Sequence, residues 1–132
     1  MIPNNTPCSV QISHGELLDK ISILEIKSQR IDSPEKLVNI RKELELLQDQ
    51  ARSLLTQKSI FNAYQALKKV NEELWETEDS IRLKEKNQAF DTEFVQLART
   101  VYFQNDNRAR IKRHINEITG SSLVEEKSYQ EY

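Results

Sequence analysis

The sequence predicts an all-α protein, an antiparallel four-helix bundle with an extended N-terminal segment and a docked C-terminal tail. Three observations lead to this prediction. The 132 residues include two glycines and three prolines and are rich in Leu, Ile, Glu, Lys and Gln, which favours helices. Apolar residues recur every three or four positions over long stretches. Helix-capping residues separate these stretches. We expect one domain over residues 1–132, with a core that needs no disulfides.

The first helix is expected to begin after Ser13 and to end near Ile31. Ser13 and Glu16 have the spacing of a capping box, in which Glu16 reaches back to the start of the helix. Apolar residues lie on two faces, with Leu17, Ile21, Leu24 and Ile31 on one and Ile23 and Ile26 on the other. A helix that is apolar on two sides is usually covered on two sides. We therefore place this helix centrally or in a homodimer interface.

Two further helices are expected between residues 34 and 86. Ser33 followed by Pro34 is a strong helix start, because proline suits the first helical position. A regular apolar stripe then predicts a helix packed on a partner, with Leu37, Ile40, Leu44, Leu47, Ala51 and Leu54 as its members. The segment 56–59 is the expected turn, since an unbroken helix over 34–86 would be about 80 Å long and mostly unpacked.

The fourth helix is expected to follow Asp91, which can cap it, and to end at Gly120. Residues 121–132 form the C-terminal tail, which contains aromatic and apolar side chains and is therefore expected to dock on the bundle. Residues 1–12 hold two of the three prolines, so they are expected to form an extended arm.

The fourth helix carries an unusual polar stripe. One face of this helix begins with the apolar residues Phe94, Ala98 and Val101. At the same helical spacing it continues with the polar residues Asn105, Arg108, Lys112 and Asn116, which we call the polar stripe. The apolar face meanwhile moves sideways to Ile111, Ile115 and Ile118. Buried polar groups need partners, so this stripe predicts either a structural ion-pair network or a site for a bound polar ligand.

An antiparallel hairpin that turns near residues 88–89 supplies acidic partners from the third helix. This register places Glu78 and Asp79 near Arg99 and Tyr102. It places Asn71 near three residues of the fourth helix, Asn105, Asp106 and Arg108. The ligand interpretation predicts a pocket for a small anion, gripped by Arg108 and Lys112. Its candidate residues are Glu78, Asp79, Arg82, Arg99, Tyr102, Asn105, Asp106, Arg108 and Lys112.

Composition argues against several other functions. The net charge is −2, and the basic residues from Arg108 to Arg113 spread around their helix, so we expect no nucleic-acid binding. No apolar run is long enough to cross a membrane, and no signal peptide is recognisable, so a cytoplasmic location is expected. Cys8 is the single cysteine and the chain has two distant histidines, so we expect no metal site. No cofactor-binding motif is present either.

One enzyme motif is incomplete. Residues 72–76 read EELWE, which resembles the EExxE of all-helical nucleotide pyrophosphohydrolases, whose carboxylates hold Mg²⁺. Those enzymes need a second motif, Glu-x-x-Asp, further along the chain. None follows Glu76, so this function is not supported.

The chain resembles a family of small, uncharacterised helical proteins of bacteria and phages. The resemblance lies in GELLDKI (15–21), ELWETEDSIR (73–82), FVQLARTVYFQNDNRARIKRHIN (94–116) and LVEEKSY (123–129). It implies a characteristic pattern rich in charged residues and amides, which includes Glu16, Asp19, Asp79, Arg99, Asn105, Arg108 and Lys112. The tail residues Glu125, Glu126, Lys127 and Tyr129 belong to the same pattern. A weaker architectural analogy is the helical chorismate mutases, in which Arg and Lys side chains of an intertwined dimer hold a dianion.

Two functions remain. The first is a non-enzymatic interaction or accessory protein that presents its helices and tail to a protein partner, with Glu125, Glu126, Lys127 and Tyr129 as the partner-binding candidates. The second is a small helical enzyme or binding module for a small anionic metabolite. A polar stripe closed on itself by ion pairs favours the first function, and a stripe that lines a cavity favours the second.

Overall fold

The computed structural model describes residues 6–132, and four helices account for most of this range. In chain order they are α1 (His14–Arg30), α2 (Pro34–Leu55), α3 (Lys58–Lys86) and α4 (Thr92–Thr119). Residues 6–132 contain no strand, which confirms the predicted all-α class. None of the four helices in this range combines the length and apolar character that a membrane crossing requires.

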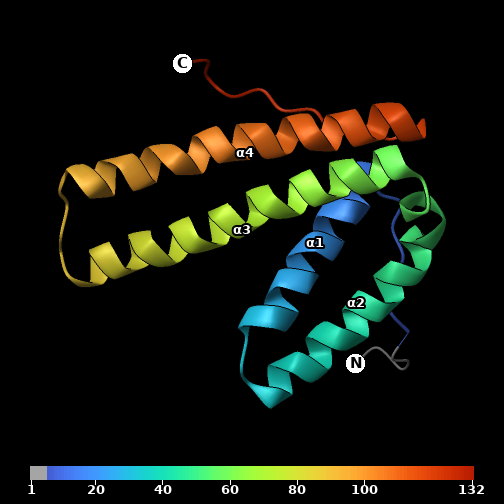
Figure 1. The fold of residues 1–132 in the computed structure, drawn as a ribbon, viewed down its shortest axis with the longest axis horizontal. Coiled ribbons are helices and arrows are strands. Elements are labelled where there is room, and N and C mark those ends of the chain that lie inside the picture. The colour runs from blue at the N-terminus through green and yellow to red at the C-terminus, as the bar shows by residue number, and fades with distance from the viewer. Residues whose placement is uncertain (1–5) are drawn as a thin grey trace.

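The helices form two antiparallel hairpins (Figure 1). The long α3–α4 hairpin is crossed by the shorter α1–α2 hairpin, which packs on the half that is remote from the α3–α4 loop. α1 packs against the other three helices, which confirms its predicted central position. The bundle is therefore antiparallel, as predicted, and one end of the long hairpin extends past α1 and α2.

Side-chain caps begin the helices at the positions that the sequence predicts. The Ser13 hydroxyl accepts a hydrogen bond from the backbone N–H of Glu16, at 3.1 Å. Asp91 caps α4 in the same way, since its carboxylate accepts from the backbone N–H of Phe94 at 2.9 Å. Ser33 caps α2, and Pro34 occupies its first turn. These local hydrogen bonds satisfy backbone donors that a helix leaves free at its start.

The remaining boundaries also match the predictions. α2 ends at Leu55 and α3 begins at Lys58, so the turn lies at the start of the predicted segment 56–59. Gly120 ends α4 with φ of 66°, a left-handed conformation that glycine adopts without steric cost.

The hydrophobic core lies where α1 meets α2, the start of α3 and the end of α4. Its buried members are Leu18, Ile21, Ala51, Ile60, Tyr64, Leu67 and Ile115. Toward the α3–α4 loop the apolar side chains of the hairpin are less covered, and Ile81 and Phe94 are half-buried. The polar stripe of α4 therefore lies in and beside the best-packed part of the bundle.

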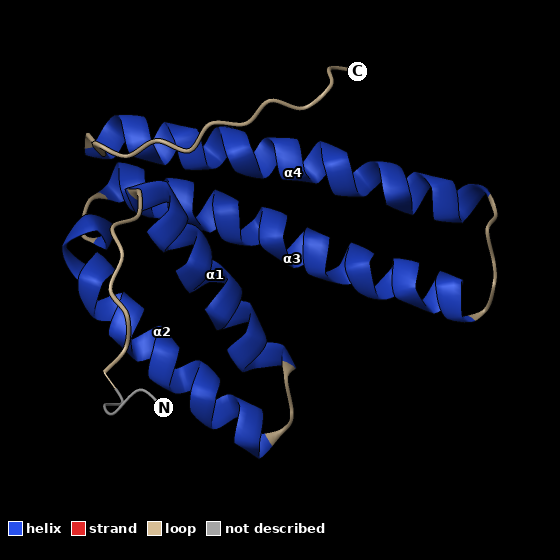
Figure 2. Cartoon of the chain, turned by 180° about the vertical axis from the view of Figure 1, so that it is seen from behind, coloured by secondary structure: helices blue, strands red, loops and turns tan. Residues whose placement is uncertain are grey.

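The two ends of the described chain differ. Residues 6–11 are exposed and have no regular structure; residues 1–5 of the predicted arm lie outside the described range. The C-terminal tail runs back along α4, as Figure 2 shows, which confirms the predicted docking. Ser121 begins this return, where its hydroxyl accepts a hydrogen bond from the backbone N–H of His14 at 3.3 Å.

Candidate functional site

The polar stripe of α4 meets the first two turns of α1. Asn116 is buried, and its side-chain oxygen accepts a hydrogen bond from the backbone N–H of Gly15 at 2.7 Å. The contact at Gly15 is so close that an added Cβ would lie 2.5 Å from the backbone oxygen of Lys112. A glycine at this position therefore lets the two backbones approach each other and brings the acidic side chains of α1 onto α4.

Asp19 of α1 is the centre of the site. Its side chain is 1% exposed. The Arg108 guanidinium donates two hydrogen bonds to its carboxylate, one of them from Nε at 2.9 Å. The side-chain amide of Asn71 on α3 donates to the same carboxylate at 2.9 Å. The Lys112 ammonium lies 3.7 Å away. Three helices thus converge on one buried carboxylate.

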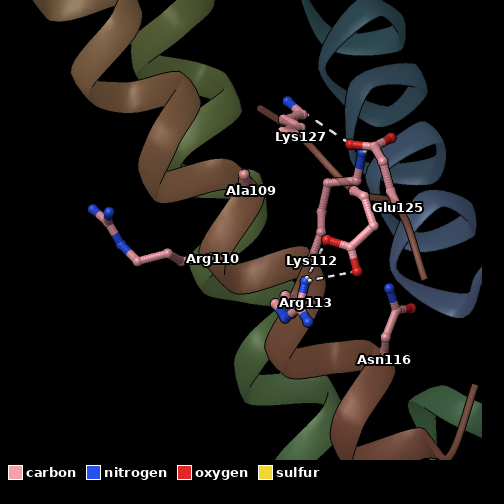
Figure 3. Close-up of a pocket in the computed structure, with 8 residues that line it drawn as sticks. Ala109, Arg110, Lys112, Arg113, Asn116, Glu125 and Lys127 are labelled. Carbon is pink, nitrogen blue, oxygen red and sulfur yellow. Dashed lines mark hydrogen bonds and ion pairs between the residues drawn. The ribbon is translucent and has the colours of Figure 1, made fainter. Parts of the chain in front are cut away.

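Lys112 connects this carboxylate to two others. Its Nζ atom donates to Glu16 at 2.7 Å and to Glu125 of the tail at 3.4 Å. Figure 3 shows Lys112 and Glu125 together between α4 and the tail. The predicted capping box is therefore half correct, because the Glu16 carboxylate bonds with Lys112 across the bundle. We call Glu16, Asp19, Asn71, Arg108 and Lys112 the Asp19 network.

The ionised forms of this network stabilise one another. Burial raises the pKa of Asp19, but the hydrogen bonds from Arg108 and Asn71 and the nearby positive charges outweigh it and hold that pKa below its ordinary value. The hydrogen bond to Asp19 raises the pKa of Arg108. Burial lowers the pKa of Lys112, yet the Glu16 and Asp19 carboxylates raise it further than burial lowers it. All three groups are therefore charged at neutral pH.

Acid is expected to weaken the fold through Asp19. A carboxyl whose pKa is lower in the folded state binds fewer protons there, so its stabilisation is complete above the ordinary pKa of 3.8. It is lost as the pH falls through the folded-state pKa. Urea unfolding of the wild type and Asp19→Asn from about pH 6 to about pH 2 measures this loss. The wild type should lose more free energy of unfolding than the variant; parallel curves would contradict the assignment.

The charged groups of the Asp19 network are paired with one another. Within residues 6–132, every buried side-chain nitrogen or oxygen atom has a hydrogen-bond partner. Arg108 and Lys112, the predicted grip for an anion, already neutralise the carboxylates of Asp19 and Glu16. Such an arrangement specifies how the helices pack, and an anion would have to compete with Asp19 and Glu16 for these two cations.

The predicted acidic partners from α3 lie elsewhere. Glu78 and Asp79 are exposed, and Glu78 pairs with Arg82 one turn along the same helix at 3.3 Å. Arg99 and Tyr102 were predicted to face them, but they contact aromatic rings instead, Arg99 that of Phe103 and Tyr102 that of Tyr132. The guanidinium of Arg99 lies over the ring of a neighbouring phenylalanine, 5.5 Å from its centroid. The hairpin turns where the sequence predicts, but Arg99 and Tyr102 do not border the groove that Glu78 and Asp79 line.

Part of the polar stripe of α4, with some of its predicted partners on α3, does line a cavity. An open groove of about 440 Å³ lies between α1, α3 and α4. It is bordered by five of the polar residues that the predicted register brings together, namely Asn71, Glu78, Asp79, Asn105 and Arg108. Apolar side chains of all three helices supply the remaining walls. Four of the nine candidate residues, Glu78, Asp79, Asn105 and Arg108, thus border one groove, to which α1 also contributes.

The tail residues use their charges to hold the tail on α4. Glu125 accepts from Lys112, and Glu126 pairs with Arg113 at 3.3 Å. Lys127 lies 3.8 Å from Glu125. A small pocket of about 170 Å³ remains between the tail and α4 (Figure 3). Tyr129 is largely exposed to solvent, since 79% of the residue is accessible.

The end of the tail completes an exposed aromatic cluster. Tyr102 and Phe103 of α4 lie next to each other, and the ring of Tyr132 packs against both, with centroid distances of 5.2 and 5.1 Å. The Tyr132 hydroxyl donates a hydrogen bond to Asp106. Each of these three rings is at least 40% exposed. We call Tyr102, Phe103 and Tyr132 the aromatic cluster; the sequence predicted that the tail docks, but not where.

The helical pattern of the sequence did not predict that Asp19 and Glu16 are the ionic partners of α4, although the family resemblance includes both residues. A signal was present. Asp19 lies on the same helical face as Ile23 and Ile26, the second apolar face of the first predicted helix. A carboxylate on an apolar face that must be covered needs a buried cationic partner, and Arg108 and Lys112 were the available cations.

Other reactive side chains contribute little to the site. Cys8 is exposed on the N-terminal segment. Across residues 6–132, no three His, Cys, Asp or Glu side chains are grouped as a metal ion would require.

Comparison with known proteins identifies a family without an assigned activity. A family model described as a family of unknown function, DUF6165, matches residues 8–132. The comparison with curated proteins found no match, and the comparison with solved structures found none either.

Proposed function

We propose that this chain, which belongs to the family of unknown function DUF6165, is a non-enzymatic interaction protein that binds a protein partner through α4 and the C-terminal tail. The observation that carries this proposal is the aromatic cluster. Tyr102, Phe103 and Tyr132 are held together by their own packing and by the hydrogen bond to Asp106, yet they stay exposed. Preorganised aromatic side chains supply most of the binding energy at many protein interfaces.

The surroundings of the aromatic cluster support the same function. A groove of about 450 Å³ lies between the tail and α4, bordered by Arg110, Lys127, Tyr129 and Tyr132. Tyrosine and arginine are the residue types that interfaces favour. The glutamates at positions 125 and 126 hold the tail in place, so we assign partner contact to the aromatic side chains and Lys127 rather than to the glutamates.

The alternative function, the binding of a small anionic metabolite by Arg108 and Lys112, has less support. Both cations pair with carboxylates of α1, so an anion would have to displace Asp19 or Glu16. A homodimer stays a prediction, and the two apolar faces of α1 no longer argue for it because α2, α3 and α4 pack on them. The cytoplasmic location and the bacterial or phage origin are inferred from the sequence alone.

The double variant Phe103→Ala with Tyr132→Ala tests the proposed function. Both rings are exposed, so their removal should leave the fold intact while it removes the centre of the interface. In affinity purification from extracts of the native host, followed by quantitative mass spectrometry, proteins enriched by the wild type should fall by roughly tenfold or more.

Phe61→Ala is the matched control. Phe61 lies on α3 with 42% exposure, against 40% for Phe103, so this substitution matches the Phe103 half of the double variant at a different place. The control should retain the partners of the wild type. An unchanged set of bound proteins with the double variant would place the partner site elsewhere, or show that no such partner exists.

A further inference from the structure

The groove between α1, α3 and α4 forms where α1 crosses the long hairpin (Figure 1). Ile23 and Ile26 of α1, Leu74 of α3 and Val101 of α4 give it apolar walls. Its volume of about 440 Å³ lies within the range of small-molecule sites. The groove is therefore large enough for a ligand with a short hydrocarbon chain, and too small for a helix of a partner.

The charge of the groove favours a cation. Arg108 is the cationic residue at its border, and its guanidinium is already bound to the buried Asp19 carboxylate. Glu78 and Asp79 bring two carboxylates to the same groove. Glu78 shares an exposed pair with Arg82, whereas Asp79 has no hydrogen bond or ion pair to any side chain of residues 6–132. A ligand therefore meets an uncompensated negative charge.

Trp75 adds an aromatic ring to the apolar walls and the carboxylates of the groove. It borders the groove between α1 and α3 and is half-buried. Glu78 and Asp79 follow it by three and four positions, so the indole and both carboxylates share one face of α3. Tryptophan is the aromatic residue that attracts cations best. An indole and two carboxylates on one helical face, in a groove with apolar walls, match an ammonium group attached to a hydrocarbon chain.

We infer that this groove binds a small organic ammonium ion, with its hydrocarbon part against Ile23 and Val101 and its charge between Trp75 and Asp79. The inference concerns a face of the molecule that contains neither Phe103 nor Tyr132. Its failure and the failure of the proposed partner interface are thus separate results.

The single tryptophan of the chain makes the experiment direct. Trp75 fluorescence, excited selectively over tyrosine, is followed while the full chain is titrated with n-hexylammonium or with n-hexanoate at matched ionic strength. The two probes share one hydrocarbon chain and differ in the sign of their charge. Hexylammonium should change the fluorescence along a saturable curve, and hexanoate should not.

Charge-neutral variants locate the cation. Asp79→Asn should weaken hexylammonium binding roughly threefold, and Asp79→Asn combined with Glu78→Gln roughly tenfold, as expected for partly exposed ion pairs. Glu45→Gln, an exposed glutamate of α2 remote from the groove, is the control and should bind like the wild type. The inference is overturned if neither probe binds, if both bind equally, or if the double variant binds hexylammonium as tightly as the wild type.

Discussion

Replacing Asp19 with alanine is expected to lower the free energy of unfolding by about 3–5 kcal/mol, the range found when one partner of a buried ion pair is removed. The reason is the charge that remains. Arg108 and Lys112 would keep their positive charges beside an empty space, and the amide of Asn71 would lose its acceptor on Asp19. Urea denaturation followed by circular dichroism measures the change.

Asp49→Ala provides the matched control. Asp49 also pairs with an arginine, Arg52, but both side chains are more than half exposed on α2. Its loss should change the free energy of unfolding by less than about 0.5 kcal/mol, because exposed pairs are screened by water. Equal and small effects of the two substitutions would show that the Asp19 network does not stabilise the fold.

Replacing Gly15 with alanine is expected to lower the free energy of unfolding by about 2 kcal/mol, as overpacking of a tight contact does. In an exposed helix the same substitution would raise the free energy of unfolding by about 1 kcal/mol. A decrease would therefore indicate the close contact at Gly15. The new Cβ would lie 2.5 Å from the backbone oxygen of Lys112, which is held within α4 and cannot move aside as a flexible side chain does. Denaturation with urea measures this change as well.

Gly120→Ala separates steric contact from backbone conformation. Gly120 has φ of 66° and open space around its Cα, so alanine there should destabilise by about 1 kcal/mol through backbone strain alone. In Gly15→Ala, chemical shifts of α1 and α4 should also move, since the helices must separate. A more stable Gly15→Ala variant would refute the close approach.

The helices and their ends were predictable because the signals are local. Ser13, Ser33 and Asp91 each cap a helix through a hydrogen bond three residues away, which the sequence pattern records directly. The central position of α1 followed from its two apolar faces. The break between two long helical stretches predicted the α3–α4 hairpin, and the position of this break also predicted the register of the two helices.

The composition of the site was less predictable, because it depends on how helices distant in sequence cross. The pairing of α4 with α3 was inferred from hairpin geometry, which says nothing about a third helix inserted beside both. Asp19 reaches Arg108 because Gly15 lets α1 approach α4 backbone to backbone, a contact across about a hundred residues of chain. A single-helix pattern contains the polar stripe but not the helix that covers it.

The position of the tail could not be predicted from the sequence for a similar reason. Its aromatic residues predicted docking, but the docking site depends on the surface that α4 leaves uncovered. Tyr102, Phe103 and Asp106 form that surface, and none of them borders the groove between α1, α3 and α4. This arrangement also explains why Tyr102 and Asp106, which were predicted to lie near residues of α3, contact the tail instead.

The coupling free energy between Asp19 and Arg108 tests most directly the claim that the polar stripe of α4 is a closed structural network. It is obtained from a double-mutant cycle with Asp19→Asn, Arg108→Gln and the combined variant, each unfolded with urea at neutral pH. A closed network predicts a coupling of about 2 kcal/mol, since the second substitution removes a charge that the first left unpaired. Single effects that add to within about 0.5 kcal/mol would contradict it and leave Arg108 available for a ligand.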